Sequence, residues 1–187
     1  MGRGRKKQYI KTLTSKDKEM LRAFRNCGRL SDSHLKNDLL MADRRVVNFQ
    51  RDGYVEKARL LNPKTREMDA VYQLTEKGRS AVESHLNLTH CYLSNSGHHD
   101  LGGADKYFSL AEDRRSSWQT ESELRETYQE RYGDLPDNFS ATDGAYLASD
   151  GRFISFEVVT RNYSQVEIQA KENFAAALGM QLEMTRI

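Results

Sequence analysis

The sequence predicts an α+β protein made of two successive domains, residues 12–88 and 89–187, preceded by a basic flexible arm, residues 1–11. The first half alternates helix-period segments with one pair of β-rich runs, whereas the second half combines helices with three strand-like runs. The charge divides at the same place. The first 88 residues hold 20 Lys/Arg against 11 Asp/Glu, and the remainder hold 9 against 16. We therefore expect two modules with different partners, of which the basic one suits phosphate.

The composition is that of a globular protein in an aqueous compartment, with 30% charged residues and a mean hydropathy of −0.79. No apolar run approaches the ~20 residues of a membrane-spanning helix. The basic N-terminus lacks the apolar stretch of a secretory signal. Cys27 and Cys91 lie far apart without a pairing pattern, which favours a reducing compartment. These observations predict a cytoplasmic protein with no membrane partner.

Three helices are predicted in succession in the first half. The first begins after Thr14 or Ser15 as N-cap and ends at Gly28. The second is a short helix within residues 30–41, with Ser31 or Asp32 as N-cap and Leu35 and Leu39 on its packed side. The third starts near Met41 and ends at Gly53. Its faces differ, because polar residues at i, i+4 and i+7 lie opposite two apolar ones. The polar set is Arg44, Asn48 and Arg51, and the apolar set is Val46 and Phe49.

A β-hairpin and a closing helix come after the three helices. The runs 54–61 and 69–74 are rich in β-forming residues, and the turn between them starts at Asn62-Pro63. Lys64 and Arg66 occupy the tip of this turn. Thr75 is the expected N-cap of the closing helix, which continues to residue 86.

This order of elements, together with the run "YQLTEKGR", resembles the winged-helix family of DNA-binding domains. The resemblance implies that the third helix enters the major groove of duplex DNA, with the hairpin as a wing and the arm adding salt-sensitive attraction. A solvated charged face and a protein-docking winged helix are the alternatives. The residues that the resemblance assigns to DNA are Arg3, Arg5, Lys6, Lys7, Arg44, Arg45, Asn48, Arg51, Lys64 and Arg66.

The second half begins with residues 87–117, which predict a strand or short helix followed by a Gly-rich connection. His90, Cys91, His98 and His99 raise a zinc hypothesis, but their spacing matches no structural zinc pattern, so packed imidazoles in a loop are favoured. A helix is then predicted over residues 118–133, with Ser117 as its N-cap and Trp118, Leu124 and Tyr128 on its buried side.

Strands are predicted over residues 143–149 and 152–160, separated by a second Asp-Gly turn, and over 180–187. The helix between the last two strands covers residues 164–179. Its expected buried side consists of Val166, Ala170, Phe174 and Ala177. A right-handed crossover would join these parts into a small α/β sandwich.

The order of these elements resembles the PD-(D/E)xK restriction-endonuclease fold. The runs "WQTESELR" and "FEVVT", on either side of an Asp-Gly at a strand start, are similar to replication-relaxation and mobile-element proteins. The resemblance assigns Glu121, Asp143 and Glu157 to catalysis, with Asp143 and Glu157 as ligands of Mg²⁺. Val159 occupies the position of the nuclease lysine, which would stabilise charge on the phosphate.

Two basic residues could replace that lysine. Lys171 lies one helix later, but it also comes four residues after Glu167, and an exposed i,i+4 pair is the favoured interpretation. Arg161 is the other candidate. Without a lysine, no cofactor is expected, and Mg²⁺ would be required only by an active nuclease.

The leading functional hypothesis is therefore a duplex-DNA-binding accessory protein of a mobile element, acting in replication, the relaxosome or transfer. Its nuclease-like domain would be catalytically silent and would contact a relaxase, a replication protein or a second copy of the chain. A Mg²⁺-dependent, site-targeted DNA endonuclease is the first alternative, and a transcriptional regulator is the second.

Overall fold

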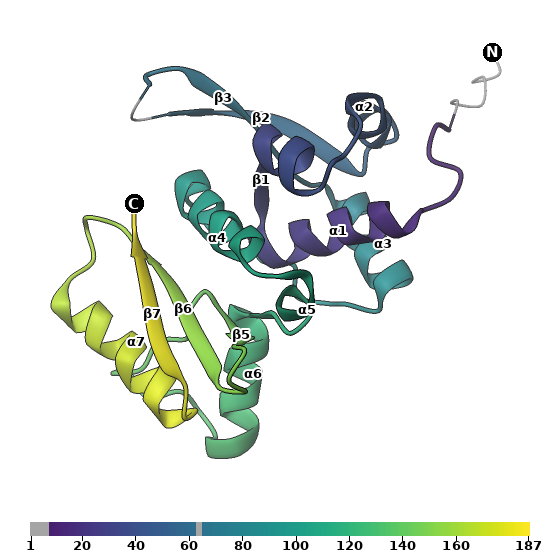
Figure 1. Ribbon diagram of the computed structural model, residues 1–187. Coiled ribbons are helices and arrows are strands. Elements are labelled where there is room, and N and C mark those ends of the chain that lie inside the picture. The colour runs from purple at the N-terminus through teal and green to yellow at the C-terminus, as the bar shows by residue number, and fades with distance from the viewer. Residues whose placement is uncertain (1–7, 63–64) are drawn as a thin grey trace, which may run out of the picture. The chain divides into compact units, whose positions relative to one another are not determined.

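The structure is a computed structural model that describes residues 8–62 and 65–187 (Figure 1). It is a mixed α+β fold with two sheets, which confirms the predicted class at that level. None of the helices in these residues combines the length and apolar character needed to cross a bilayer. Five of the residues assigned to DNA fall outside the described residues: Arg3, Arg5, Lys6, Lys7 and Lys64.

The chain divides into two compact units. The first consists of the chain through Arg25 together with Leu30–Thr89. The second consists of Asn26–Arg29 together with His90–Ile187.

The first unit combines helices with a sheet in the order β1-β3-β2. Strands β2 and β3 pair as an antiparallel hairpin, as predicted, in a register from Val55↔Leu74 to Leu61↔Met68. Its elements in chain order are α1 (Ser15–Cys27), β1 (Arg29–Ser31), η1 (His34–Asp38), α2 (Asp43–Arg51), β2 (Val55–Leu61), β3 (Met68–Leu74) and α3 (Glu76–Leu86).

The predicted short second helix is present, with Leu35 and Leu39 buried as expected, but its centre is a π-helical turn, η1. Leu30 and Ser31, which precede it, belong to the short strand β1. The backbone N–H of His34 donates to the Ser31 hydroxyl, and the Ser31 N–H donates to the His34 imidazole. The bond to the Ser31 hydroxyl is the N-cap interaction expected of Ser31, and Leu40, at φ +49°, ends the turn.

Helix α2 has the two faces that the sequence predicts. Val46 and Phe49 are buried, whereas Arg44 and Arg51 are exposed and Asn48 is half-buried. The Thr75 cap of α3 is also confirmed, because its hydroxyl accepts from the Gly78 N–H.

The predicted flexible arm, residues 1–11, is too long at its C-terminal end. The backbone N–H groups of Tyr9 and Ile10 donate to the Asp52 carboxylate at 2.9 and 2.6 Å. Ile10 is 2% exposed. Residues 9 and 10 are therefore attached to the end of α2.

The second unit is a four-stranded sheet in the order β4-β5-β6-β7, in which only the β6–β7 pair is parallel (Figure 1). The crossover between β6 and β7 is α7, as predicted. The elements are α4 (Gly97–Ser109), α5 (Glu112–Arg115), β4 (Gln119–Thr120), α6 (Glu121–Tyr132), β5 (Gly144–Leu147), β6 (Phe153–Val159), α7 (Gln165–Ala177) and β7 (Gln181–Arg186).

The sheet lies between α4 on one face and α6 with α7 on the other. A Cβ on Gly102 of α4 would lie 3.0 Å from Val158 of β6, so glycine permits the helix to pack closely there. Glu157 points to the opposite face, where Lys171 of α7 contacts it. The core on that face is Leu124, Tyr128, Ala141, Ala145, Phe174 and Leu178.

Helix α4 corrects the prediction of a loop through residues 97–109. Gly102 and Gly103 favoured a connection in the sequence. The helix forms because the Ser96 hydroxyl caps it by accepting from the His99 N–H, and because Gly102 gains close packing on the sheet.

Two further details differ from the prediction. Helix α6 begins at Glu121, and its cap is Thr120 rather than Ser117. Residues 119–120 pair with β5 instead, because Thr120 and Glu123 form a capping box that fixes the helix start. In α7, Val166 is 78% exposed rather than buried, whereas Ala170 and Phe174 face the core.

Candidate metal centre

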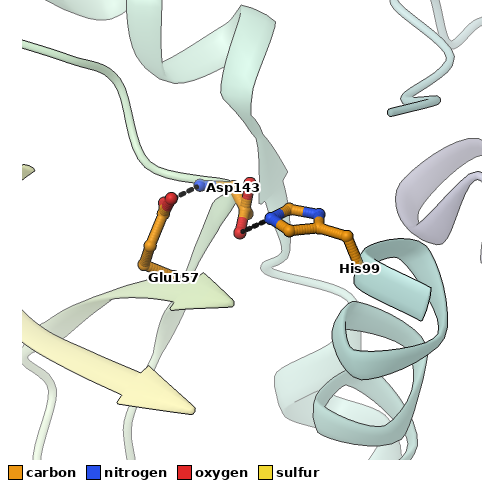
Figure 2. Close-up of side chains that lie close together, drawn as sticks. All are labelled: His99, Asp143 and Glu157. Carbon is orange, nitrogen blue, oxygen red and sulfur yellow. Dashed lines mark hydrogen bonds and ion pairs between the residues drawn. The ribbon is translucent and has the colours of Figure 1, made fainter. Parts of the chain in front are cut away.

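Three side chains in the second unit offer ligand atoms that all lie within 4.8 Å of one another: His99, Asp143 and Glu157 (Figure 2). All three residues are buried. His99 comes from the first turn of α4, Asp143 directly precedes β5, and Glu157 lies in the middle of β6. His99, more than forty residues before either carboxylate in the sequence, therefore meets both of them at one point.

The antiparallel pairing of β5 and β6 brings the two carboxylates together. Because Gly144 pairs with Phe156, the preceding Asp143 lies beside Glu157. The backbone N–H of Asp143 donates to Glu157 Oε2 at 3.0 Å. The Val158 N–H in turn donates to Asp143 Oδ2 at 2.7 Å. Both carboxylates are thus held by backbone groups, which fixes their orientation.

His99 contacts Asp143 directly. Its Nε2 lies 3.2 Å from Asp143 Oδ2, and its Nδ1 lies 3.1 Å from the Tyr92 hydroxyl. The Tyr92 hydroxyl also donates to Asp143 Oδ1 at 3.3 Å. Burial lowers the pKa of His99, but the hydrogen bond and charge of Asp143 outweigh burial and raise it. Tyr92 remains a hydrogen-bond donor because burial, and then the charge of Asp143, raises its pKa.

Glu157 is fully buried and carries its own set of donors. Lys171 Nζ lies 2.9 Å from Glu157 Oε1, and the Tyr163 hydroxyl donates to the same oxygen at 2.7 Å. Burial, followed by the negative charge of Asp143, raises the pKa of Glu157 to about 7, although Lys171 opposes this shift. The site therefore concentrates more negative charge than its lysine neutralises.

Lys171 corrects the prediction of an exposed pair with Glu167. Glu167 instead accepts hydrogen bonds from the backbone and hydroxyl of Ser164, in the capping box of α7. The side chain of Lys171 is 12% exposed, and its ammonium donates to the Ala141 carbonyl oxygen at 2.7 Å as well as contacting Glu157. Val159 is buried, so the ammonium at this site comes from α7 rather than from β6.

Glu121 does not belong to the ligand group found among the described residues. It is the first residue of α6, and its carboxylate accepts from Arg125 at 2.7 Å in an i,i+4 pair. Glu121 therefore forms an ion pair along α6 and takes no part in the ligand group.

The zinc hypothesis included one residue of the cluster and three that lie elsewhere. His99 is the one that joins the two carboxylates. His90 lies 3.0 Å from Glu126 instead. The signal that could have found His99 was Ser96 three residues before it, because an N-cap there starts a helix and places His99 in its first turn.

The donor set fits a divalent cation. One imidazole and two carboxylates are ligands that Mn²⁺, Fe²⁺ and Zn²⁺ accept, whereas Mg²⁺ prefers oxygen alone. Two tyrosines would orient these ligands, since the Tyr92 hydroxyl contacts the other imidazole nitrogen and the Tyr163 hydroxyl donates to the Glu157 carboxylate. Such an ion would supply Lewis-acid chemistry, which polarises a bound phosphate.

In the first unit, the residues assigned to DNA differ in their exposure and in their contacts with other side chains. Arg44 and Arg66 are exposed, and the guanidinium of Arg51 lies over the Tyr9 ring at 5.4 Å. The guanidinium of Arg45 donates to the buried Asp17 carboxylate and to the Thr12 carbonyl oxygen. Arg45 therefore also has a structural contact within the first unit.

Comparison of the chain with protein families, with curated proteins and with solved structures gave no match.

Proposed function

We propose that this protein binds duplex DNA through its first unit and a divalent cation through its second. The observation that carries the DNA interpretation is the polar face of α2. Arg44 and Arg51 are exposed there, while Val46 and Phe49 on the opposite face hold the helix in the core. A helix held in this way can present side chains to a major groove without losing its own packing.

The order of elements supports a winged-helix interpretation of this unit. Helix α2 is followed by the β2–β3 hairpin and by α3, with Arg66 in the hairpin turn. Arg66 would contact phosphate, as the wing does in that family. Arg45 would contribute indirectly, because its bonds to Asp17 connect α2 to the start of α1.

The biological setting of the proposal is that of the leading hypothesis: an accessory protein of a mobile element, acting in replication, the relaxosome or transfer. The second unit would contact a relaxase, a replication protein or a second copy of the chain. This part rests on the resemblance to replication-relaxation proteins, since the mixed α/β order of the second unit supports a PD-(D/E)xK-like fold.

A salt titration of duplex binding tests the DNA proposal. Arg44→Ala/Arg51→Ala is expected to weaken binding and to reduce the slope of log Kobs against log salt by about two, one for each lost phosphate contact. Arg79→Ala is the matched control, because Arg79 is exposed on α3 of the same unit. Equal loss in both variants would mean that general basic charge, not the α2 face, binds DNA.

A metal-dependent DNA endonuclease is a second candidate, favoured by one observation. Lys171 Nζ lies 2.9 Å from Glu157 Oε1, so the ammonium that β6 lacks is present beside the carboxylates. Lys171 could stabilise negative charge on a phosphate oxygen, while Asp143 and Glu157 hold the cation.

Plasmid nicking separates the two candidates. Wild-type protein, Asp143→Asn and Lys171→Met are incubated with supercoiled plasmid and Mn²⁺ or Mg²⁺. Cleavage by wild type that both variants lose would establish the nuclease. A wild type that binds plasmid and Mn²⁺ without nicking it would establish the catalytically silent protein.

A further inference from the structure

The carboxyl ends of the two parallel strands, β6 and β7, enclose a small cavity. Val159 pairs with Arg186 at these ends, and the Ile187 N–H donates to the Val159 carbonyl oxygen. The cavity has a volume of about 70 Å³. It is lined by Val159, Thr160, Arg161, Tyr163, Arg186 and Ile187. In α/β sheets, the carboxyl ends of parallel strands are where ligands bind.

The two arginines of this cavity have no ion-pair partner among residues 8–62 and 65–187. Several other basic side chains of the same unit are paired: Lys106 with Glu183, Arg125 with Glu121, and Arg152 with Asp150. Residues 89–187 hold 9 basic against 16 acidic residues. Arg161 and Arg186 are exposed and line one cavity together without a carboxylate partner, which points to an anion from outside the chain.

The cavity is connected to the candidate metal centre through Tyr163. This residue lines the cavity, and its hydroxyl donates to Glu157 Oε1 at 2.7 Å. Burial, and then the charge of Glu157, raises the pKa of Tyr163, so its hydroxyl keeps its proton. An anion in the cavity would thus lie next to Tyr163, which holds a ligand of the candidate metal centre.

We propose that this cavity binds a phosphate group of a nucleic-acid backbone, held by the guanidinium groups of Arg161 and Arg186. The cavity, about 70 Å³, has room for one small tetrahedral group. Planar guanidinium groups bind phosphate oxygens through paired N–H donors, which an ammonium cannot do. The Thr160 side chain adds a hydroxyl to the same wall.

This inference names the phosphate contact of the site and so rests on the proposed function. It also gives Arg161 a different role from that of a lysine substitute. Arg161 would bind the phosphate from the loop after β6, and Lys171 would remain on Glu157.

Isothermal titration with inorganic phosphate and with the dinucleotide pTpT tests the proposal. Wild-type protein is expected to bind pTpT, and Arg161→Gln and Arg186→Gln are each expected to weaken it about tenfold, the effect of losing one charged hydrogen-bonding group. Arg186→Lys is expected to lose nearly as much, because it keeps the charge but not the fork. Arg152→Gln, at an exposed arginine near the start of β6, is the control.

The two ligands distinguish the sources of the phosphate. Binding of pTpT well above that of inorganic phosphate supports a backbone contact, whereas equal binding of both overturns the nucleic-acid part of the proposal. Unchanged affinity in both Gln variants, or a wild type that binds neither ligand, overturns all of it.

Mn²⁺ binding by the same samples separates this inference from the proposed function. Arg161→Gln is expected to bind Mn²⁺ as wild type does. Loss of Mn²⁺ binding in the wild type, with pTpT binding intact, would overturn the metal centre and leave the phosphate site standing.

Discussion

Each unit holds a buried carboxylate against a basic side chain from a helix, but the two surroundings differ. In the first unit, Asp17 accepts from the backbone and hydroxyl of Thr14 and from two nitrogens of Arg45. Burial raises the pKa of Asp17, but the hydrogen bonds of Arg45 and Thr14 outweigh it and lower the pKa. The single negative charge of Asp17 is therefore balanced by the single positive charge of Arg45.

In the second unit, two carboxylates share the position. Glu157 has Lys171, but Asp143 lies beside it, and the pKa of Glu157 rises to about 7. A proton on Glu157 or His99 then supplies the positive charge that the residues around it lack. Similar contacts therefore have different consequences. The Asp17–Arg45 pair stabilises the first unit, whereas His99, Asp143 and Glu157 could hold a cation.

The largest expected effect is the response of the second unit to Mn²⁺. At a free concentration of about 100 times Kd, Mn²⁺ should stabilise that unit by about 2.7 kcal/mol. Fluorescence of Trp118, the single tryptophan, reports its unfolding. His99→Gln and Asp143→Asn should remove the response, and Asp150→Asn, at an exposed carboxylate, should retain it.

A comparison of Mn²⁺ with Mg²⁺ on the wild type distinguishes the candidate ions. Mn²⁺ should stabilise the wild type more than Mg²⁺ does, because the imidazole is a better ligand for Mn²⁺. If wild type unfolds at the same temperature with and without Mn²⁺, the cluster is an ion-pair network only, and both units belong to the same structural type.

Lys171→Met should give the next largest effect, a loss of about 2 kcal/mol in the free energy of unfolding at pH 7. Removal of one partner leaves Glu157 buried without its cation, although Glu157 can reduce the cost by taking up a proton. Urea unfolding followed by Trp118 fluorescence measures it. Glu157→Gln in the same chain should recover part of the loss, since the uncompensated charge is then gone.

Lys106→Met is the matched control for Lys171→Met. The Lys106 ammonium lies 2.7 Å from the carboxylate of Glu183, whose side chain is 40% exposed. The loss in the free energy of unfolding should therefore be smaller than for Lys171→Met. Equal losses in the two variants would show that burial of Glu157 has no special cost.

The sequence predicts the elements better than it predicts these contacts. Periodicity and caps were enough to predict α1, α2, α3, α7 and the hairpin, because these depend on local residues. Helix α4 was missed because two glycines argue against a helix locally, whereas Gly102 is favoured by packing on Val158. That packing is a property of the sheet, which no local pattern contains.

The candidate site was predicted in part for the same reason. Asp143 and Glu157 were predicted from the resemblance, and the pairing of β5 with β6 brings them together. His99 was named only in the zinc hypothesis, and its place beside the two carboxylates was missed because it depends on α4. Arg45 was predicted to bind DNA and Lys171 to form an exposed pair, and neither contact with a buried carboxylate was predicted, because spacing along a helix does not reveal a carboxylate on another element.

The Asp17 pair should give a moderate effect with a defined pH dependence. Asp17→Asn is expected to cost about 1 kcal/mol at pH 7, because Arg45 keeps partial exposure to water. The lowered pKa of Asp17 stabilises the folded state above its ordinary value of 3.8, and this contribution is lost as pH falls through the folded-state value.

Circular dichroism of thermal unfolding between pH 2 and 7 measures this dependence. The difference in Tm between wild type and Asp17→Asn should be constant above pH 5 and should shrink toward pH 2. A difference that stays constant over the whole range would remove Asp17 as a stabilising charge, and with it the comparison between the two units.

The smallest effect is expected for Glu167→Gln, the change at the residue that sequence spacing pairs with Lys171. Its carboxylate accepts from the Ser164 N–H at the start of α7, so the variant should lower Tm by no more than about 2 °C through a weaker cap. Mn²⁺ binding should not change, because Lys171 remains on Glu157. Titration of Mn²⁺ into wild type and Glu167→Gln measures this.

A loss of Mn²⁺ affinity comparable to that of Asp143→Asn would mean that Lys171 divides its charge between Glu167 and Glu157. The negative charge of Asp143 and Glu157 would then no longer be what distinguishes the second unit from the first.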